Sequence, residues 1–444
     1  MKEPMHPDLP ENRPRVPDHP ELCEAVIHAS MLQEEEYFRR ANYDESKVPP
    51  YTLPPIPDTL EQWEAQRAGI LQDAKDCLYG IVPPAPDKVE LKLLAERTDA
   101  LDGTALRREY RIYCRMDNGR SFDFDMMLYV PANAKTPPPV FVVENFYGNQ
   151  GSTPDLDVLP TRAPGRAPGN ICTVSENPQR RAYAMDRMNY KECIRRGYAI
   201  ATACYGEIFP DNPDGARRSC YSLYMDDLRP DYEVPVQEWK DGRRRDYAAY
   251  SGWAWGYSRM ADALEQIPLV DASKLACVGQ SRLGSASMWA GINDSRFGLV
   301  CVNNSGQGGA PLLRRHFGGR IDILSIGRCS FWACSSVIRY SAGREHELPI
   351  DTHQLLGLIA PRALYVTSSS RDLNADPRGT FLAAAHASKV WNLYGYRGLE
   401  SFEMPPVDTP IGDRVRYHVK TGSHSITPYD WEQFYNFADE VFGK

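Results

Sequence analysis

Apolar residues in this chain gather in short runs of strand length, and these runs alternate with longer segments of helical periodicity. The short runs occupy residues 140–144, 198–203, 275–278, 299–302, 363–367 and 415–419. Runs of this kind are typical of strands buried on both faces of a parallel sheet. Helical patterns occupy residues 247–267 and the last segment, where Thr427, Pro428 and Asp430 form a helix start. The alternation predicts an α/β fold with a parallel sheet covered by helices on both faces.

Two segments ahead of these runs have the pattern of a β-hairpin. Residues 106–115 and 121–130 flank Asp117-Asn118-Gly119, and a turn of this composition between two strand patterns favours a hairpin.

The first 85 residues have a different character, which predicts an N-terminal extension packed on a catalytic domain of residues 86–444. Residues 22–41 have helical character, and residues 47–57 are rich in proline and are predicted to be extended. Residues 59–79 predict a second helix with one apolar face, formed by Leu60, Trp63, Ile70, Leu71, Ala74 and Leu78.

Two polar stretches interrupt the alternation of strands and helices. Residues 151–180 are rich in Pro, Gly and Arg, and residues 206–245 are rich in charge. Both are longer than ordinary connections, so they are expected to be inserted functional lids or mobile loops.

Composition restricts the partners of the chain. Its 444 residues carry a net charge of -8, which argues against nucleic acid or an anionic membrane as the main partner. No apolar run approaches the roughly 20 residues that a membrane-spanning helix needs. The start of the chain lacks the basic and apolar regions of a signal peptide, so a cytoplasmic location is expected. A secreted or periplasmic location would require that an export signal had been removed.

Cysteine usage agrees with that expectation. The 11 cysteines are scattered singly and form no C-x-x-C pair, which favours reduced thiols over a disulfide framework or a zinc site.

The candidate chemistry centres on Ser281. The apolar run at 275–278 leads into Gly279-Gln280-Ser281 and then into small residues of helical character. This is the setting of a nucleophile elbow, in which a tight strand-to-helix turn exposes a serine hydroxyl. The usual motif is G-x-S-x-G, but here the second glycine, Gly284, comes one residue late. The alternative is an exposed serine in an ordinary turn.

A serine nucleophile needs a general base, and in this architecture the order along the chain is Ser, acid, His. His424 follows the last predicted strand and precedes the last helix, which is where the base is expected, whereas His418 lies within the strand. A surface loop histidine is the alternative for His424.

The acid is expected in the loop after the strand at 363–367. Asp372 and Asp376 both lie there, and Asp372 is favoured because Asp376, directly before Pro377, is typical of a turn or helix cap. Either could instead be a solvated turn residue.

Donors for the oxyanion are expected from two places. The backbone N–H of Arg282 follows the nucleophile, and the loop that begins at Asn145 follows the strand at 140–144. The Arg282 guanidinium could hold a substrate carbonyl or an oxyanion, or it could form a surface ion pair.

These residues carry a resemblance to a known family. The run Gly-Gln-Ser-Arg-Leu-Gly at 279–284 resembles the G-x-S-R-x-G signature of glucuronoyl esterases, carbohydrate esterase family 15. Bacterial members are similar in further stretches, at 303–310, 348–353, 359–362, 372–377, 422–424 and 429–432. The likeness covers about residues 40–444.

The resemblance implies a three-layer α/β/α sandwich of the α/β-hydrolase type, with no metal and no organic cofactor. It implies hydrolysis of esters between (4-O-methyl-)glucuronate on xylan and a lignin alcohol, with Ser281, Arg282 and His424 in the catalytic roles. Trp332 is similar to a sugar-contacting tryptophan of the family, although a core or cap position is an equal alternative. Gln307, in one of the shared stretches, is expected to bind substrate.

Two positions depart from the family pattern. Many members carry a Glu as the acid where this chain has Asn304, which again points to Asp372 as the acid. The family also usually carries a Lys that contacts the sugar where this chain has Ser285, and this loss of a cation puts glucuronate specificity in question.

Three functions therefore compete. The leading hypothesis is a serine carboxylic ester hydrolase that acts on a small-molecule or oligosaccharide glucuronate ester. The first alternative keeps the triad but acts on acetyl esters, as an acetyl xylan esterase or a general esterase. The second is a hydrolase-fold binding protein with impaired catalysis, since fold alone does not establish function.

Overall fold

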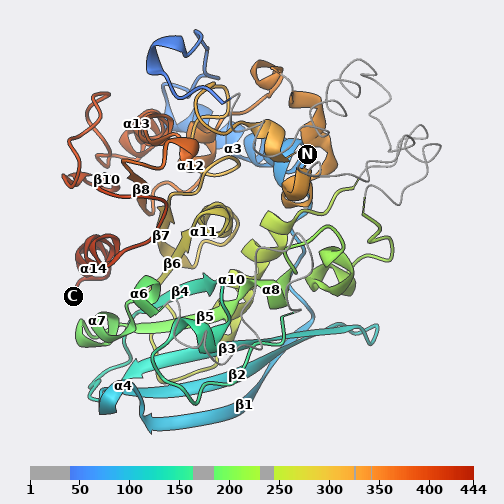
Figure 1. Cartoon of the computed structure of the whole chain (residues 1–444), viewed down its shortest axis with the longest axis vertical. Coiled ribbons are helices and arrows are strands. Elements are labelled where there is room, and N and C mark those ends of the chain that lie inside the picture. Colours follow the sequence, from blue (N-terminus) through green and yellow to red (C-terminus); the bar gives the residue numbers. More distant parts are fainter. Residues whose placement is uncertain (1–40, 164–184, 231–244, 325–326, 342) are drawn as a thin grey trace, which may run out of the picture.

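The computed structural model describes residues 41–163, 185–230, 245–324, 327–341 and 343–444, which form one mixed sheet with helices on both faces (Figure 1). The strands are β1 Lys88–Asp99, β2 Ala105–Arg115, β3 Ser121–Pro131, β4 Val140–Asn145, β5 Ala199–Cys204, β6 Leu275–Gln280, β7 Phe297–Asn303, β8 Ala363–Ser369, β9 Ile411–Gly412 and β10 Val415–Lys420. Their order in the sheet is β1-β2-β3-β5-β4-β6-β7-β8-β10-β9.

The sheet has a parallel centre and antiparallel edges. Strands β5, β4, β6, β7, β8 and β10 run parallel, while β1, β2 and β3 form an antiparallel meander and β9 pairs antiparallel with β10. The carboxyl ends of the parallel strands therefore meet at one edge, where ligands bind in open α/β sheets.

Helices cover the two faces. They are α3 Leu60–Ala74, α4 Ala100–Gly103, α5 Asn149–Ser152, α6 Met185–Met188, α7 Tyr190–Arg195, α8 Tyr205–Ile208, α10 Ala249–Leu264, α11 Arg282–Asn293, α12 Thr352–Gly357, α13 Pro377–Leu393 and α14 Pro428–Phe442. Short turns are η1 Glu45–Lys47, η2 Lys75–Tyr79, η4 Gly215–Arg218, η5 Cys220–Leu223, η7 Ile321–Leu324, η8 Gly327–Trp332, η9 Ser335–Tyr340, η10 Glu345–Glu347 and η11 Leu373–Ala375.

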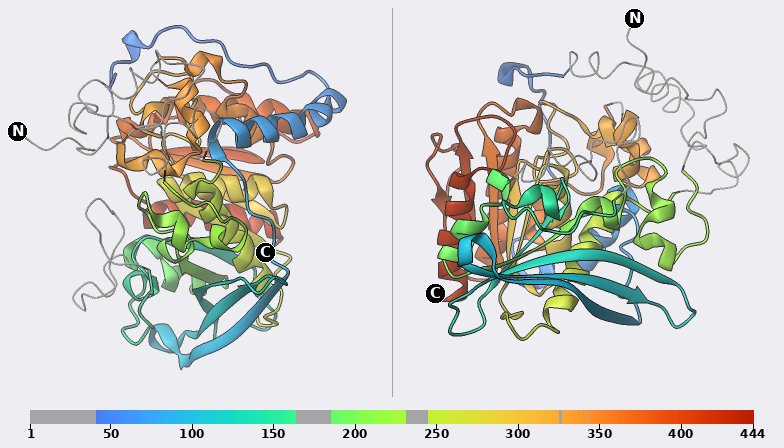
Figure 2. Two further views of the ribbon diagram at one scale, coloured as in Figure 1. Left: turned by 90° about the vertical axis from the view of Figure 1, so that its right-hand side faces the viewer. Right: turned by 60° about the horizontal axis from the view of Figure 1, so that its bottom comes forward.

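Alternating side chains of each central strand enter two separate cores, and this produces three layers. In β4, Val140 and Val142 join the core that contains α10 and α11, while Phe141 and Val143 join the core that contains α7 and α14. Helices α7 and α14 accordingly lie on the opposite side of the sheet from α10 and α11 (Figures 1 and 2). The predicted α/β/α sandwich of the α/β-hydrolase type is confirmed.

The structure also contains elements that the pattern did not predict. The predicted hairpin is confirmed as β2 and β3, but it is extended by β1, in which Val89, Leu91 and Leu93 alternate with charged residues. Charged side chains suit the exposed edge of a sheet, so this alternation was a strand signal that the sequence contained. Helix α13 was likewise missed, although the cap at its start was expected. The helical character at 22–41 lies outside the described residues except for its last position.

The described part of the N-terminal segment packs on α12. Trp63 of α3 is fully buried and lies against Gly357, and Arg67 donates from Nη2 to the carbonyl of Leu358 (3.0 Å) and from Nη1 to that of Ala360 (3.2 Å). Upstream of α3, His353 Nε2 lies 2.8 Å from the carbonyl oxygen of Pro54. These contacts fit an extension that packs on the catalytic domain, but the division at residue 85 stays a prediction.

None of the helices in the described ranges combines the length and the apolar character that crossing a bilayer requires. The nine cysteines within those ranges are all free and buried.

The contribution of the extension to stability can be measured with two substitutions in α3. Trp63→Ala removes a fully buried indole, so we expect a loss of roughly 3–5 kcal/mol in the free energy of unfolding in urea. The matched control is Gly69→Ala in the same helix, where an added Cβ meets no atom within 4 Å. It is expected to stabilise by about 0.5–1 kcal/mol. An unchanged unfolding free energy for Trp63→Ala would show that the extension folds independently of the domain.

Candidate active site at the carboxyl edge of the sheet

Ser281 lies between β6 and α11 with a backbone conformation that non-glycine residues rarely adopt. Its φ is +59° and its ψ is -138°, and such strain persists only where the surrounding structure imposes it. The Ser281 N–H donates to the carbonyl of Asn303 at the end of β7 (2.9 Å). A Cβ at Gly279 would lie 1.9 Å from the carbonyl oxygen of Leu283. The turn therefore requires glycine at 279 and has the geometry of a nucleophile elbow.

The position of the second glycine also has a structural reason. A Cβ at Gly284 would lie 2.9 Å from the carbonyl oxygen of Asn303 and 3.1 Å from the side chain of Ser305. Gly284 thus allows the first turn of α11 to approach the end of β7. The late glycine therefore serves helix-to-strand packing, as the final glycine of the usual motif is expected to do.

His424 and Asp372 meet in the loops that follow β10 and β8. His424 Nδ1 lies 2.5 Å from Asp372 Oδ2, with the carboxylate largely buried and the imidazole 43% exposed. The two loops are tied together because the Arg371 N–H donates to the carbonyl of Gly422 (2.9 Å) and the Gly422 N–H donates to Ser370 Oγ (3.2 Å). The favoured histidine and the favoured carboxylate are therefore brought together.

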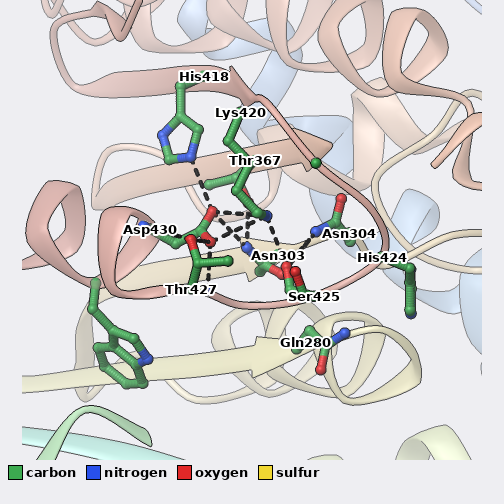
Figure 3. Close-up of polar contacts among 12 residues, drawn as sticks. Gln280, Asn303, Asn304, Thr367, His418, Lys420, His424, Ser425, Thr427 and Asp430 are labelled. Carbon is green, nitrogen blue, oxygen red and sulfur yellow. Dashed lines mark hydrogen bonds and ion pairs between the residues drawn. The ribbon is translucent and has the colours of Figure 1, made fainter. Parts of the chain in front are cut away.

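A buried polar cluster lies beneath the His424 loop (Figure 3). Asp430 accepts hydrogen bonds from Asn303 Nδ2 (2.9 Å) and Lys420 Nζ (3.1 Å), and its Oδ1 lies 3.0 Å from His418 Nε2. Burial opposes its ionisation, but the bond from His418 and the charge of Lys420 hold the pKa of Asp430 below its ordinary value. Lys420 also donates to the carbonyl of Ser425 (2.7 Å) and so anchors the residue after His424.

Asp376, the alternative acid, has other partners. It caps α13 by accepting the N–H of Gly379 (2.9 Å), and it forms a buried ion pair with Arg315. Burial raises the pKa of Asp376 to about 6, against the opposing charge of Arg315. Its contacts are those of a helix cap, as its position before Pro377 predicts.

Arg282 is buried rather than solvated on the surface. Its guanidinium lies 4.8 Å from the ring of Phe146, 5.1 Å from Trp332 and 5.5 Å from Tyr205. Nη2 donates to the Tyr205 hydroxyl (3.1 Å), and Nε lies 3.0 Å from Asp211 Oδ2. Burial opposes the charge, but Asp211 outweighs it and holds the pKa of Arg282 above its ordinary value. The surface ion pair considered from the sequence is therefore wrong.

The loop after β4 lies beside the elbow. Its Phe146 and Tyr147 line a small cavity together with Gly279 and Gln280 of the elbow. The Asn145 amide donates to Asn149 Oδ1 (2.9 Å) and Thr202 Oγ1 (3.0 Å), so the structure uses both of its amide hydrogens to order this loop. A direct role of Asn145 toward substrate stays a prediction.

Gln307 and Trp332 lie on the segments after β7. Gln307 Nε2 donates to the carbonyls of Gly319 (2.5 Å) and Asn374 (3.2 Å), which ties the Asp372 loop to the loop at 318–319. Trp332 is half-buried against Arg282, and its Nε1 donates to Asp211 Oδ1 (2.8 Å). Their contacts with substrate stay predictions.

Sequence reasoning missed Tyr205 and Asp211. Tyr205 directly follows β5, so its place at the carboxyl edge could have been inferred from the strand that precedes it. Asp211 lies six residues further on, in a turn-rich part of the stretch at 206–245, and no local pattern distinguishes it from a solvated turn residue.

The two departures from the family pattern have structural counterparts. Asn304 Nδ2 donates to the carbonyl of Ser425 (2.9 Å), so this amide anchors the His424 loop instead of supplying a charge. Ser285 is fully buried, and a Cβ at Gly309 would lie 2.6 Å from its Oγ. A lysine at 285 would therefore require the loop at 305–309 to move.

Ser281 and His424 both lie at the carboxyl edge. In Figure 3 the His424 ring points toward the end of β6, where Gln280 precedes Ser281. Within the described ranges no hydrogen bond joins Ser281 Oγ to His424, and such bonds are often long before substrate binds.

In the same ranges no three His, Cys, Asp or Glu side chains are gathered as a metal site would need.

Comparison with known proteins identifies the family to which the chain belongs. A family model described as glucuronyl esterase, fungi, matches residues 242–395. A carbohydrate esterase from an unknown prokaryotic organism is 33% identical over 420 residues, which cover 90% of this chain and 92% of that protein. The chain belongs to the glucuronoyl esterases, carbohydrate esterase family 15. As a member of this family it is a carboxylic ester hydrolase.

Solved structures of the family agree with this assignment. The glucuronoyl esterase from Solibacter usitatus is 35% identical, with a TM-score of 0.79, over 90% of this chain and 100% of that one. A promiscuous esterase of the same family from a marine bacterial metagenome is 32% identical, with a TM-score of 0.77, over 90% of this chain and 100% of that one. The likeness to glucuronoyl esterases thus extends over the described sheet and both helical layers.

The two acidic residues of this glucuronoyl esterase can be distinguished by mutation. Asp372→Asn leaves an amide that cannot balance an imidazolium, so we expect kcat to fall on the order of 10⁴-fold. Asp376→Asn leaves Arg315 buried without its partner, so the main effect is a loss of roughly 3–5 kcal/mol in unfolding free energy. Both variants are measured for kcat on p-nitrophenyl acetate and for urea unfolding. The opposite ranking in kcat would transfer the role of the acid to Asp376.

Arg282→Lys tests whether the guanidinium acts through its shape. An ammonium cannot contact Asp211 and Tyr205 while also presenting a planar donor group to the substrate. We expect kcat/KM to fall by about 10²-fold, the usual cost of losing one oxyanion donor. A variant that keeps nearly the wild-type kcat/KM would restrict Arg282 to a structural role.

Proposed function

We propose that this protein hydrolyses esters between the carboxyl group of a (4-O-methyl-)glucuronate residue and an alcohol, through an acyl-enzyme on Ser281. The observation that carries the proposal is the 2.5 Å contact between His424 Nδ1 and Asp372 Oδ2, at the sheet edge where Ser281 has its strained backbone. Relatives that are 27–34% identical over about a third of this chain are 4-O-methyl-glucuronoyl methylesterases. Their names supply the substrate class.

Acylation begins when Ser281 Oγ attacks the ester carbonyl and His424 Nε2 accepts the hydroxyl proton. Asp372 holds the Nδ1 proton and balances the imidazolium that forms, and a base in this position contributes roughly 10²–10⁴ in rate. The charge that develops on the carbonyl oxygen is stabilised by the Arg282 N–H and by the Arg282 guanidinium. His424 then returns the proton to the leaving alcohol as the bond between carbon and the alcohol oxygen breaks.

Deacylation repeats these steps with water in place of the serine. His424 removes a proton from water, the hydroxide adds to the acyl carbon, and the proton returns to Ser281 Oγ as the acyl bond breaks. The products are a free uronic acid and the regenerated enzyme. The net reaction consumes only the ester and one water molecule, and every side chain returns to its starting state.

Acetyl esters are a second candidate substrate class, and the buried Ser285 favours them. Where the family usually carries a lysine, this chain has a hydroxyl packed against Gly309, so one donor that could hold the sugar hydroxyls of a glucuronoyl group is missing. An acetyl xylan esterase or a general esterase would use the same Ser281, His424 and Asp372. The structure of a relative described as promiscuous fits this alternative.

The substrate class is tested with methyl glucuronate, p-nitrophenyl acetate and acetylated xylo-oligosaccharide, each assayed with wild type and with Ser281→Ala. We expect wild type to hydrolyse methyl glucuronate with the highest kcat/KM. We expect Ser281→Ala to lose kcat on the order of 10⁶-fold. Turnover of the acetate esters alone would replace the uronate assignment with the acetyl alternative.

A serine-directed phosphonate probe gives an independent readout of the nucleophile. Labelling of wild type but not of Ser281→Ala is expected, whereas equal labelling of both would place the nucleophile elsewhere.

The cytoplasmic location expected from the first residues stays a prediction, since residues 1–40 lie outside the described ranges.

A further inference from the structure

Asp211 lies in the described part of the inserted stretch at 206–245 and contacts three side chains of the site. Its side chain is only 2% exposed. Oδ1 accepts the indole N–H of Trp332 (2.8 Å), and Oδ2 accepts the hydroxyl of Tyr205 (2.7 Å). Oδ2 also lies 3.0 Å from Arg282 Nε. A single buried carboxylate therefore connects the guanidinium beside the nucleophile with the indole expected to contact the sugar.

These contacts determine which part of the Arg282 guanidinium can face substrate. Asp211 contacts Nε, and the Tyr205 hydroxyl accepts from Nη2. Neither contact uses Nη1, so in the proposed mechanism this amino group of the planar fork is the one available to the ester. Because the aromatic rings and Asp211 surround the guanidinium before substrate arrives, little reorganisation is needed during the reaction.

The donors around Asp211 require a carboxylate and not an amide. Trp332 Nε1 donates to one oxygen and the Tyr205 hydroxyl donates to the other, which also lies 3.0 Å from Arg282 Nε as its ion-pair partner. An asparagine has one acceptor oxygen and one NH₂ group, so in either orientation its NH₂ would face a donor. Asparagine would also leave the buried charge of Arg282 without its counter-ion, which is costly in a site of low dielectric.

We propose that Asp211 is a positioning residue that holds the Arg282 guanidinium and the Trp332 indole in one fixed arrangement, so that ester activation and sugar binding depend on the same carboxylate. This inference rests on the proposed function, because it assigns a role toward a sugar ester. It gives part of the inserted stretch a definite task in the site, since Asp211 acts through Arg282 and Trp332 without touching the substrate.

The experiment measures kcat and KM on methyl glucuronate for Asp211→Asn, Asp211→Glu and Tyr205→Phe in the full chain. Asp211→Asn is expected to lower kcat/KM by about 10²-fold, since a misplacement of about 1 Å at a reacting group has this effect. Asp211→Glu keeps the charge but moves the carboxylate by one methylene, so a loss of roughly tenfold is expected. Tyr205→Phe removes the hydrogen bond of the guanidinium but leaves its ion pair with Asp211, and it is expected to lose less. Values within about twofold of wild type for all three variants would overturn the inference.

A double-mutant cycle separates positioning from a general structural role. If Asp211 acts through Arg282, Asp211→Asn should change kcat by less than about twofold in an Arg282→Ala background. An equal loss of kcat in both backgrounds would contradict this. Trp332→Phe keeps an aromatic ring, though a smaller one, and removes the N–H bonded to Asp211, so it is expected to raise KM more than it lowers kcat.

The matched control is Glu109→Gln. Glu109 is also buried and lies 3.3 Å from the buried Arg107, but it belongs to β2, which β3, β5 and β4 separate from β6. This variant is expected to lose thermal stability while it keeps the wild-type kcat/KM. A comparable loss of activity in Glu109→Gln would show that any disturbed buried ion pair has this effect, and the inference would fail.

Failure of the inference differs from failure of the proposed function. Full turnover of methyl glucuronate by Ser281→Ala would overturn the proposed function. An inactive Ser281→Ala together with normal Asp211 variants would overturn the positioning role alone. If Asp211→Asn does not fold, Asp211→Glu and Tyr205→Phe still decide the question.

Discussion

The close approach of α11 to the ends of β6 and β7 is the constraint on which the site depends. Gly279 and Gly284 remove the two Cβ atoms that would collide with the backbone of this turn, and the Ser281 N–H is bonded to β7. The backbone of Ser281 is consequently held in a strained conformation that presents its hydroxyl at the carboxyl edge. The positions of the other candidate catalytic groups matter only in relation to this turn.

Next to this turn, buried polar residues hold the exposed His424 side chain and its loop in place. His424 is partly exposed, but Asp372 contacts its ring, and Asn304 and Lys420 hold the carbonyl of the next residue. The charge of Lys420 is in turn balanced by Asp430, and both side chains are buried. An exposed imidazole can therefore keep a defined orientation while remaining accessible to water and substrate.

On the substrate side of the site, the charge that matters most is the buried guanidinium of Arg282. Ser285 and Asn304 are uncharged, and Arg187 donates to Gln280 Oε1 (3.2 Å), on the residue before the elbow serine. The positive charge on the residue directly after Ser281 is that of Arg282. Asp211 balances this charge, and three aromatic rings cover it. Recognition is therefore expected to depend on the direction of the guanidinium's remaining hydrogen bonds more than on net charge.

The sequence by itself determined the parallel strands at the centre of the sheet, the β2–β3 hairpin, the elbow at Ser281 and the placement of His424 after β10. These features are local, because apolar runs, capping residues and glycine spacing act over a few positions. The choice between Asp372 and Asp376 was also foreseeable, since a carboxylate before proline is typical of a helix cap. Only the tertiary structure decided the pairing of His424 with Asp372, the burial of Arg282 and the part played by Asp211. Those features depend on contacts between distant residues, such as His424 with Asp372, 52 positions apart, and Trp332 with Asp211, 121 positions apart. No local pattern records which distant side chain will neutralise a buried charge.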